Sequence, residues 1–404
     1  MKTKLLINTR IIDPQNNIDE VGGILIDDNG KIKAIGKNVT KNNVPKDCEI
    51  IDCKGNISIP GIVDMRVFVG EPGFEYKENF RTLSEAALSG GVTSVVTMPN
   101  TMPVIDNGSI LDFTKRRAKD KSQIKIYPLA TLTKNLEGNE MSEFGLLGII
   151  GAIGFTDGIK CVQNNRVMDK IFNYSKNLNS LIIQFPQDNE LSTNGSVNEG
   201  EVSTRLGLKG ISTVSSKASL PVIETYKNKG LEFTTGVSIN NLSLNENDIG
   251  DFRTFLKLSP PLRTENDRLA LIDAIKKGII DVIVSDHKPE DEESKRLPFQ
   301  QAATGASGIE TLLSLTLELY HNQSCDLKTL IKTLTCNPAK ILNINAGNLS
   351  IGSDADIAVV NLDKPWVVEK EKIKSKSKNT AIEKRRMQGK VEKTFINGNL
   401  VFEG

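Results

Sequence analysis

The sequence is poor in the two residue types that most often carry metal and redox chemistry. It contains only two histidines, His287 and His321, in 404 residues. Because imidazole is a preferred ligand of zinc and related metals, this count limits metal chemistry more than any motif does. The five cysteines are scattered and form no Cys-x-x-Cys pair. This pattern favours buried or idle thiols in a reducing compartment.

Long apolar runs and an excess of one charge are also absent. No segment approaches the roughly 20 apolar residues of a membrane span. Residues 1–8 are too short and polar for a signal peptide. Lysine and arginine total 51 against 50 aspartates and glutamates. The sequence therefore indicates no nucleic-acid or membrane partner and predicts a cytoplasmic protein.

Common nucleophile and phosphate motifs are missing as well. The chain has no Gly-x-Ser-x-Gly elbow and no Walker A sequence. A Ser-His-Asp arrangement would have to use His287, which directly follows Asp286. On an extended strand these two side chains point apart. Catalysis by an activated serine is therefore disfavoured.

The two ends of the chain share one sequence pattern, which is typical of short β-strands. Residues 1–58 and 348–404 alternate short apolar runs with turns, and Asp28-Asn29-Gly30 is a hairpin signal. We expect both segments to join into one small composite β-sandwich, with residues 59–347 as the inserted domain. A Lys/Ser-rich run over residues 370–378 predicts a solvated loop.

The inserted segment alternates strand-like and helix-like stretches, which is typical of an α/β protein with a parallel sheet. Seven clear strands predict a (β/α)8 barrel of the TIM type. The strand candidates are 59–65, 92–97, 124–129, 152–156, 181–185, 231–237 and 281–285. The helix candidates lie near 78–89, 107–119, 141–149, 167–177, 217–229, 267–277, 309–321 and 327–334.

The room for a further, sixth strand is small. About 45 residues separate the candidates 181–185 and 231–237, and a parallel crossover takes a dozen or more residues. We expect a short helix at 201–208, at most a stub of strand at 211–215 and a full helix at 217–229. The barrel should be degenerate around this sixth strand.

Residues 59–73 read as a buried strand that runs into the polar loop Glu71-Pro72-Gly73. This segment resembles the first barrel strand and loop of dihydroorotases. Further segments match that family in the same order along nearly the whole chain. We identify the chain as a member of the dihydroorotase family, in the cyclic amidohydrolase superfamily. The matching segments are 98–101, 154–158, 198–208, 259–263, 281–287, 308–311, 352–356 and 377–380.

The resemblance implies a metal site that this chain has lost. The family carries His-x-His at the positions of Arg66 and Phe68, and a substrate-gripping arginine at the position of Gly70. Its histidines on the fifth and sixth strands align with Gln184 and near Thr213. A guanidinium and a phenyl ring cannot ligate a divalent metal. We expect no cofactor, and zinc only if the protein is an active hydrolase.

Some family site residues remain. Asp157 stands where some members have an aspartate ligand, and Asp286 stands where the family has its ligand and general base. Asn100 and His287 match residues that bind substrate. Two carboxylates alone make at best a hard-oxygen, magnesium-like site. We expect Arg66 to fill the vacated metal space and to pair with Asp286 or Asp157, because a buried carboxylate needs a compensating charge.

Three functions stay open. The first is a catalytically inactive member that scaffolds or regulates aspartate carbamoyltransferase within an oligomer. The second is an active dihydroorotase, which opens dihydroorotate to carbamoyl aspartate at a rebuilt site around Asp157, Asp286 and His287. The third is a metal-free interaction protein of the dihydropyrimidinase-related type. Bound metal separates the first from the second, and co-purification with a transcarbamoylase separates the first from the third.

Overall fold

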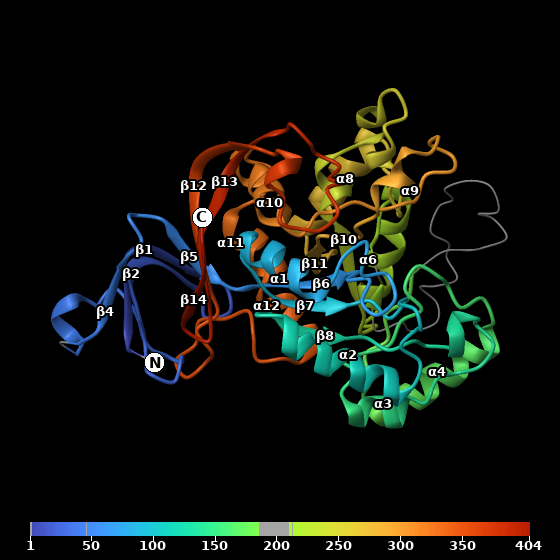
Figure 1. Cartoon of the computed structure of the whole chain (residues 1–404), viewed down its shortest axis with the longest axis horizontal. Coiled ribbons are helices and arrows are strands. Elements are labelled where there is room, and N and C mark those ends of the chain that lie inside the picture. Colours follow the sequence, from blue (N-terminus) through green and yellow to red (C-terminus); the bar gives the residue numbers. More distant parts are fainter. Residues whose placement is uncertain (1, 46, 186–209, 212) are drawn as a thin grey trace.

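The computed structural model describes residues 2–45, 47–185, 210–211 and 213–404. Its two parts are visible in Figure 1: a β-rich part with strands from both ends of the chain, and an α/β part built from the middle. In the part of the chain that is described, no helix combines the length and apolar character needed to cross a bilayer.

The β-rich part is one eight-stranded sheet. Its order is β14-β13-β12-β5-β1-β2-β3, with β4 paired to β1. The blue and red strands in Figure 1 therefore belong to the same sheet. The strands are β1 Lys4–Asp13, β2 Ile18–Ile26, β3 Ile32–Gly36, β4 Glu49–Asp52, β5 Ile57–Pro60, β12 Ile357–Val367, β13 Arg386–Ile396 and β14 Asn399–Glu403.

This sheet has a hydrophobic core of its own. Ile24 and Ile26 from β2 belong to the same buried cluster as Ile357 from β12 and Phe395 from β13. β2 comes from the first part of the chain and β12 and β13 from the last, so the two ends share one sheet and one buried cluster. The strand pairing is that of a single sheet, where we expected a composite β-sandwich.

The α/β part arranges parallel strands around a barrel. β6 pairs with β7 and β7 with β8, all in parallel. Single bridges at Phe155 and Ile182 continue the sheet, and β10 pairs in parallel with β9 and β11. A bridge between Val67 and His287 joins the end of β11 to β6, whereas among the described residues no strand pairing joins Ile182 to β9. The strands are β6 Ile62–Val67, β7 Val92–Thr97, β8 Lys125–Pro128, β9 Gly210–Ile211, β10 Thr234–Ser238 and β11 Val282–Val284.

The sixth strand position is represented by the two-residue strand β9. Within the described residues it pairs with β10, and Val214 N–H extends this contact with a 2.7 Å hydrogen bond to Gly236 O. The helix expected at 217–229 is present as a short 3₁₀ turn, Lys217–Ser219, followed by α6, Leu220–Asn228. The helix expected at 201–208 lies outside the described residues, so the degeneracy of the barrel stays a prediction.

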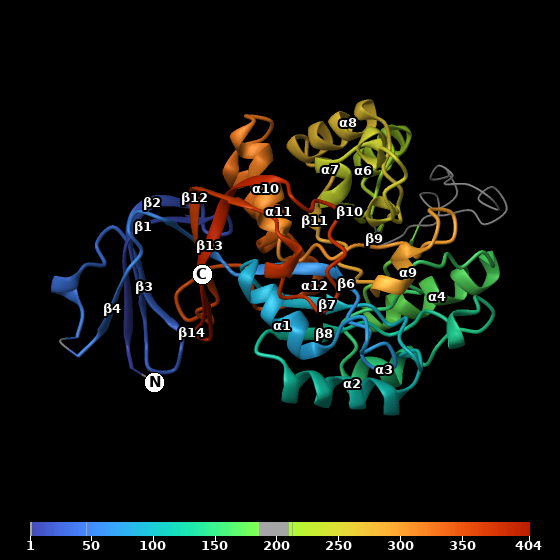
Figure 2. The same ribbon diagram turned by 45° about the horizontal axis from the view of Figure 1, so that its top comes forward.

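Helices cover the barrel on opposite sides, as Figure 2 shows for α2, α3 and α4 against α6, α7 and α8. The eight helix candidates are all present within a few residues, whereas α7, α9 and α12 were not among them. The helices are α1 Phe80–Ser89, α2 Gly108–Lys121, α3 Phe144–Ile150, α4 Asn165–Leu178, α6, α7 Ile239–Ser243, α8 Glu265–Lys276, α9 Glu292–Arg296, α10 Leu312–His321, α11 Leu327–Leu334 and α12 Cys336–Leu342.

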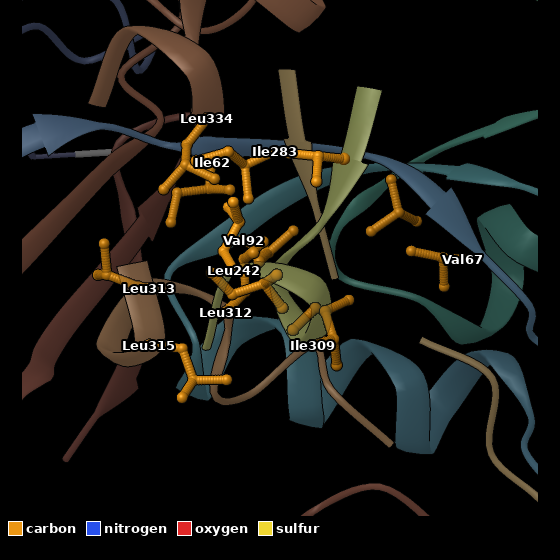
Figure 3. Close-up of a cluster of buried hydrophobic side chains, with 14 of the residues drawn as sticks. Ile62, Val67, Val92, Leu242, Ile283, Ile309, Leu312, Leu313, Leu315 and Leu334 are labelled. Carbon is orange, nitrogen blue, oxygen red and sulfur yellow. The ribbon is translucent and has the colours of Figure 1, made fainter. Parts of the chain in front are cut away.

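The main core lies between the barrel strands and these helices. Strand residues Ile62, Val92 and Ile283 share one cluster with Leu312 and Leu334 from the helices (Figure 3). All five are fully buried. Strands of a parallel sheet are covered on both faces, which explains why the barrel strands are apolar runs rather than alternating ones.

The segment 59–65, predicted as a single barrel strand, is divided at Gly61 between β5 and β6. A Cβ atom at Gly61 would lie 2.2 Å from Thr93 Oγ1 and 2.8 Å from Thr93 Cβ. Because Gly61 has no side chain, its backbone can pack directly against Thr93 of β7 where the chain passes from the sheet to the barrel.

We predict that Gly61→Ala lowers the free energy of unfolding by about 1–3 kcal/mol, the usual cost of forcing atoms into a packed site. Gly148→Ala in α3 is the matched control, because a Cβ there meets no atom within 4 Å. The control should be neutral or stabilising by about 0.5–1 kcal/mol. Urea unfolding followed by circular dichroism measures both, and equal stability of the two variants would contradict the packing argument.

Candidate functional site at the barrel mouth

The most buried charge pair at the carboxyl ends of the barrel strands joins Arg66 and Asp286. Arg66 lies on β6, and Asp286 follows β11 directly. Arg66 Nε donates to Asp286 Oδ1 at 2.8 Å, and the two side chains are only 8% and 12% exposed. Burial raises the pKa of Asp286, and the nearby Arg66 charge opposes this shift. The expected pairing of Arg66 with Asp286 is therefore confirmed.

The Arg66 guanidinium also lies over an aromatic ring. Its central carbon is 5.6 Å from the centre of the Phe185 ring, within the range of cation–π attraction. The charge is thus held from two sides, by a carboxylate and by a π face. A second cation beside Asp286 would be repelled by the Arg66 charge, and it would compete with Arg66 for Asp286 Oδ1.

Asp157, the other retained carboxylate, is bonded elsewhere. Its Oδ1 accepts the backbone N–H groups of Leu132 and Thr133 at 2.8 and 3.0 Å, and its Oδ2 accepts the Thr133 hydroxyl at 2.5 Å. These bonds tie the fourth strand position to the loop after β8. The alternative pairing of Arg66 with Asp157 is therefore not the one that forms.

The loop after β6 is built on Gly70, where the family has an arginine. Gly70 has φ +75°, and a Cβ there would lie 2.7 Å from Phe74 O and 3.1 Å from Glu78 O. Gly70 O accepts the Phe74 N–H at 2.5 Å, which closes the turn. Phe68 packs against Phe74 with ring centres 6.2 Å apart. A side chain at position 70 would force this loop to change its course.

Gln184 and Thr213, at the two other histidine positions, are buried. The Gln184 amide donates to Cys161 Sγ at 2.9 Å, while Gln184 Oε1 and Thr213 Oγ1 have no hydrogen-bond partner among the described residues. Thr213 and Arg66 line a small cavity of about 40 Å³ inside the barrel. Neutral oxygens are poor zinc ligands compared with imidazole or thiolate.

His287, matched to a substrate-binding residue, is fully enclosed by the protein. Its Nδ1 accepts the Gly308 N–H at 3.2 Å, so its proton lies on Nε2, which is 3.6 Å from Glu78 Oε2. The side chain has no exposed surface. In this arrangement His287 joins the end of β11 to the segments before α10 and α1.

Asn100, the second residue matched to substrate binding, keeps a free acceptor. Its Oδ1 is buried and has no hydrogen-bond partner among the described residues. The side chain lies against Gly158, where a Cβ atom would approach within 3.5 Å. A role of Asn100 in holding a ligand stays a prediction.

Glu78 is a buried site residue that the sequence analysis missed. Burial alone would raise the pKa of this carboxyl, but the nearby His287 ring and the hydrogen bonds from the Ser375 and Thr82 hydroxyls outweigh it and lower the pKa. Ser375 is in the run predicted as a solvated loop, and that prediction is only half right. Its lysines face solvent, whereas Ser375 and Ser377 are buried, with Ser377 Oγ bonded to Lys77 O at 2.7 Å.

Asp64 on β6 was also missed. It is fully buried, and its Oδ1 accepts the backbone N–H groups of Arg66 and Ser285, both at 3.2 Å. Its Oδ2 has no hydrogen-bond partner among the described residues. Burial raises the pKa of Asp64 to about 6. The signal that could have identified Asp64 is its position as a lone charged residue between the apolar residues Val63 and Met65 of a predicted strand.

The fold is similar to solved cyclic amidases. L-hydantoinase from Arthrobacter aurescens matches with a TM-score of 0.90 at 22% identity, over 100% of this chain and 96% of that one. Dihydropyrimidinase from Brevibacillus agri matches with 0.86 at 20% identity, over 99% and 95%. The chain therefore shares their fold, an α/β barrel of the TIM type with a sheet domain. The family model described as "Amidohydrolase family" matches residues 216–401.

The model described as "Dihydro-orotase-like" matches residues 55–221. Curated proteins named "Dihydroorotase" match almost end to end. The one from Syntrophus aciditrophicus is 39% identical over 99% of this chain and 99% of its own length. The one from Ehrlichia canis is 38% identical over 99% and 95%. The chain belongs to the dihydroorotase family.

Members of this superfamily usually bind metals such as zinc, so the fit of the residues to a metal is a direct test. The chain has two histidines in total. His287 is bonded within the protein, and His321 ends α10 with its Nε2 buried. In the described ranges, no three His, Cys, Asp or Glu side chains gather where they could hold a metal ion. The residues at the barrel mouth do not fit the family's metal centre.

We predict that Arg66→Met lowers the free energy of unfolding by about 3–5 kcal/mol, because it leaves Asp286 buried without a compensating charge. Arg66→Met combined with Asp286→Asn should recover most of this loss. Arg116→Met is the matched control, since the Arg116–Asp112 pair is 78% and 47% exposed and is worth at most about 1 kcal/mol. Chemical denaturation at neutral pH measures all three. A loss no larger than that of the control would contradict a buried, compensated pair.

We predict a pH dependence from Asp64. Its folded pKa of about 6 exceeds the ordinary 3.8, so the folded state holds a proton that the unfolded state releases between these values. Wild-type stability should therefore fall as pH rises through this window, by on the order of 3 kcal/mol from this group. Asp64→Asn removes that dependence. Its stability relative to wild type should rise from about pH 4 to about pH 7, and a difference that stays constant with pH would refute the shift.

Proposed function

We propose that this chain is a dihydroorotase-family protein of pyrimidine biosynthesis that has lost hydrolysis and acts through contacts with aspartate carbamoyltransferase. One observation carries the first half: Arg66 is bonded to Asp286 at the strand ends where the family holds its metals. The guanidinium charge replaces the metal charge as the partner of this carboxylate.

Hydrolysis of a cyclic amide by this family needs a metal-activated water and a polarised carbonyl. In this chain the carboxylate that would accept the proton of that water already accepts from Arg66. The loop at Gly70 has no side chain to hold a substrate carboxylate, and neutral groups do not replace a bidentate arginine. The proton acceptor is thus already bonded to Arg66, and the group that would hold the substrate carboxylate is missing.

The active alternative has one specific observation in its favour. Relatives that match nearly the whole chain at 36–39% identity are named dihydroorotase. These names support ring opening of dihydroorotate to carbamoyl aspartate more directly than they support an inactive role. Such an enzyme would use a rebuilt site around Asp157, Asp286 and His287, with zinc as its cofactor. In the structure all three of these side chains make bonds within the protein.

The third possibility, a metal-free interaction protein of the dihydropyrimidinase-related type, is supported by the fold alone. The likeness to dihydropyrimidinase is 20% in sequence identity. The dihydroorotase relatives at 38–39% identity favour a place in pyrimidine biosynthesis instead.

We predict that the purified protein contains well under one zinc per chain and does not hydrolyse dihydroorotate above background. Elemental analysis and a dihydroorotate assay measure these two quantities. The dihydroorotase of Syntrophus aciditrophicus, purified and assayed in parallel, is the positive control. Stoichiometric, tightly bound zinc, or turnover that disappears on chelation, would establish the active alternative.

Restoring histidine at positions 66 and 68 together should not restore turnover. Gln184, Thr213 and the loop at Gly70 would still lack the family's groups, and catalytic groups that act as a unit fail together. The double variant Arg66→His, Phe68→His is assayed with added zinc, after circular dichroism has shown that it is folded. Measurable turnover would show that the loss of function is confined to β6.

The second half of the proposal predicts a complex with aspartate carbamoyltransferase. A barrel that is kept without its metal ligands is consistent with retention for its surface. Mixed at micromolar concentration, the two proteins should elute together from a size-exclusion column, with at least about 1,000 Å² buried per contact. Elution as two independent species would contradict the partnership without bearing on hydrolysis.

A further inference from the structure

A cavity of about 350 Å³ lies away from the barrel mouth, where the barrel helices meet the terminal sheet. It is bounded by the end of α1, the start of α10, strands β12 to β14 and the segment 367–374. Its volume is within the range of sites for small organic ligands, and such sites often lie between domains. Nothing in the proposed function uses this cavity.

Two aromatic side chains, Trp366 and Phe402, form part of the wall. The Trp366 ring is held in place, because its Nε1–H donates to Gly389 O at 3.0 Å. The same carbonyl accepts the hydroxyl of Ser314 from α10 at 2.8 Å. The wall is therefore fixed to both parts of the molecule, and part of it is aromatic.

The carboxylate of Glu310, which lines the cavity, has its hydrogen-bond partners within the protein. Glu310 Oε1 accepts the backbone N–H groups of Lys374 and Ser375 at 2.8 and 2.9 Å, and its Oε2 accepts the Ser89 hydroxyl at 3.2 Å. These bonds anchor the segment that carries Lys374 over the cavity. Because the carboxylate is used in this way, it does not serve as the main contact for a ligand.

Four further charged residues line the cavity, namely Glu369, Lys372, Lys374 and Lys390. Lys390 Nζ lies 6.0 Å from the centre of the Trp366 ring. Lys374 is exposed, and its backbone N–H donates to Glu310 Oε1. Neither ammonium forms a salt bridge within the described residues, whereas Lys372 is paired with Glu369 at 2.8 Å. Two ammonium groups without carboxylate partners, beside an aromatic wall, favour a ligand that is both planar and anionic.

We propose that this cavity binds a small planar aromatic anion, in which a ring stacks on Trp366 and Phe402 while a phosphate or carboxylate contacts Lys374 and Lys390. A nucleoside monophosphate supplies the phosphate form of this chemistry, and a benzoate supplies the carboxylate form. The site is independent of the barrel mouth and of any hydrolytic activity.

The chain contains a single tryptophan, Trp366, so tryptophan fluorescence reports this cavity alone. The full-length protein is titrated with uridine 5′-monophosphate and, separately, with benzoate, with corrections for absorbance by the probe. We expect a saturable change in emission with at least one of them. Uncharged uridine and inorganic phosphate are the controls, and each should bind at least about tenfold more weakly than the better probe.

The lysines provide the decisive variants. Lys374→Gln and Lys390→Gln should each weaken the better probe by about tenfold, because each removes a charge-assisted contact. Lys370→Gln, on the same segment but outside the lining of the cavity, is the matched control and should leave the affinity unchanged. A response to uridine monophosphate or to benzoate alone identifies the source of the anion and supports the site.

Three outcomes would overturn the proposal. The first is no saturable change with either probe at millimolar concentration. The second is an affinity that Lys374→Gln and Lys390→Gln leave unchanged. The third is inorganic phosphate acting as strongly as the nucleotide, since this would remove the need for the aromatic wall. Circular dichroism of each variant separates a lost site from a lost fold.

Discussion

The structure of the barrel mouth depends on the compensation of one buried charge. Asp286 follows β11 beside the bridge that joins Val67 on β6 to His287. A carboxylate at this depth needs a cation, and removal of the cation alone would cost several kcal/mol. Arg66, from the neighbouring strand, supplies the positive charge, and its Nε donates to Asp286 Oδ1 at 2.8 Å. The family scaffold can therefore persist without a metal, provided that an arginine stands at this position.

The surrounding changes are consistent with that substitution. Because Gly70 has no side chain, the loop after β6 turns back on itself, and Glu78 lies close to its backbone. Glu78 then gathers Ser375, Thr82 and the ring of His287 around one buried carboxylate. Space near the strand ends is thus taken by protein contacts rather than by a ligand set.

Much of the fold and part of the site could be predicted from the sequence. The apolar runs located the barrel strands, and the need to compensate a buried carboxylate predicted a bond from Arg66 to Asp286 or Asp157, of which the bond to Asp286 is present. Glu78 could not be predicted, because its environment depends on Ser375, which is 297 residues away in the chain. The run 370–378 is mostly lysine and serine, and this composition does not indicate that Ser375 and Ser377 are buried while the lysines next to them are exposed. Gly61 divides one predicted strand into two by a close approach to Thr93 that only the tertiary structure reveals.

The central claim is that the Arg66 guanidinium takes the place of a metal at Asp286. Crystals of the protein grown with excess zinc, with diffraction recorded at the zinc absorption edge, test it most directly. Our account predicts no anomalous peak at the barrel mouth and an intact hydrogen bond from Arg66 Nε to Asp286 Oδ1. An anomalous peak within bonding distance of Asp286, with the Arg66 side chain moved aside, would contradict it.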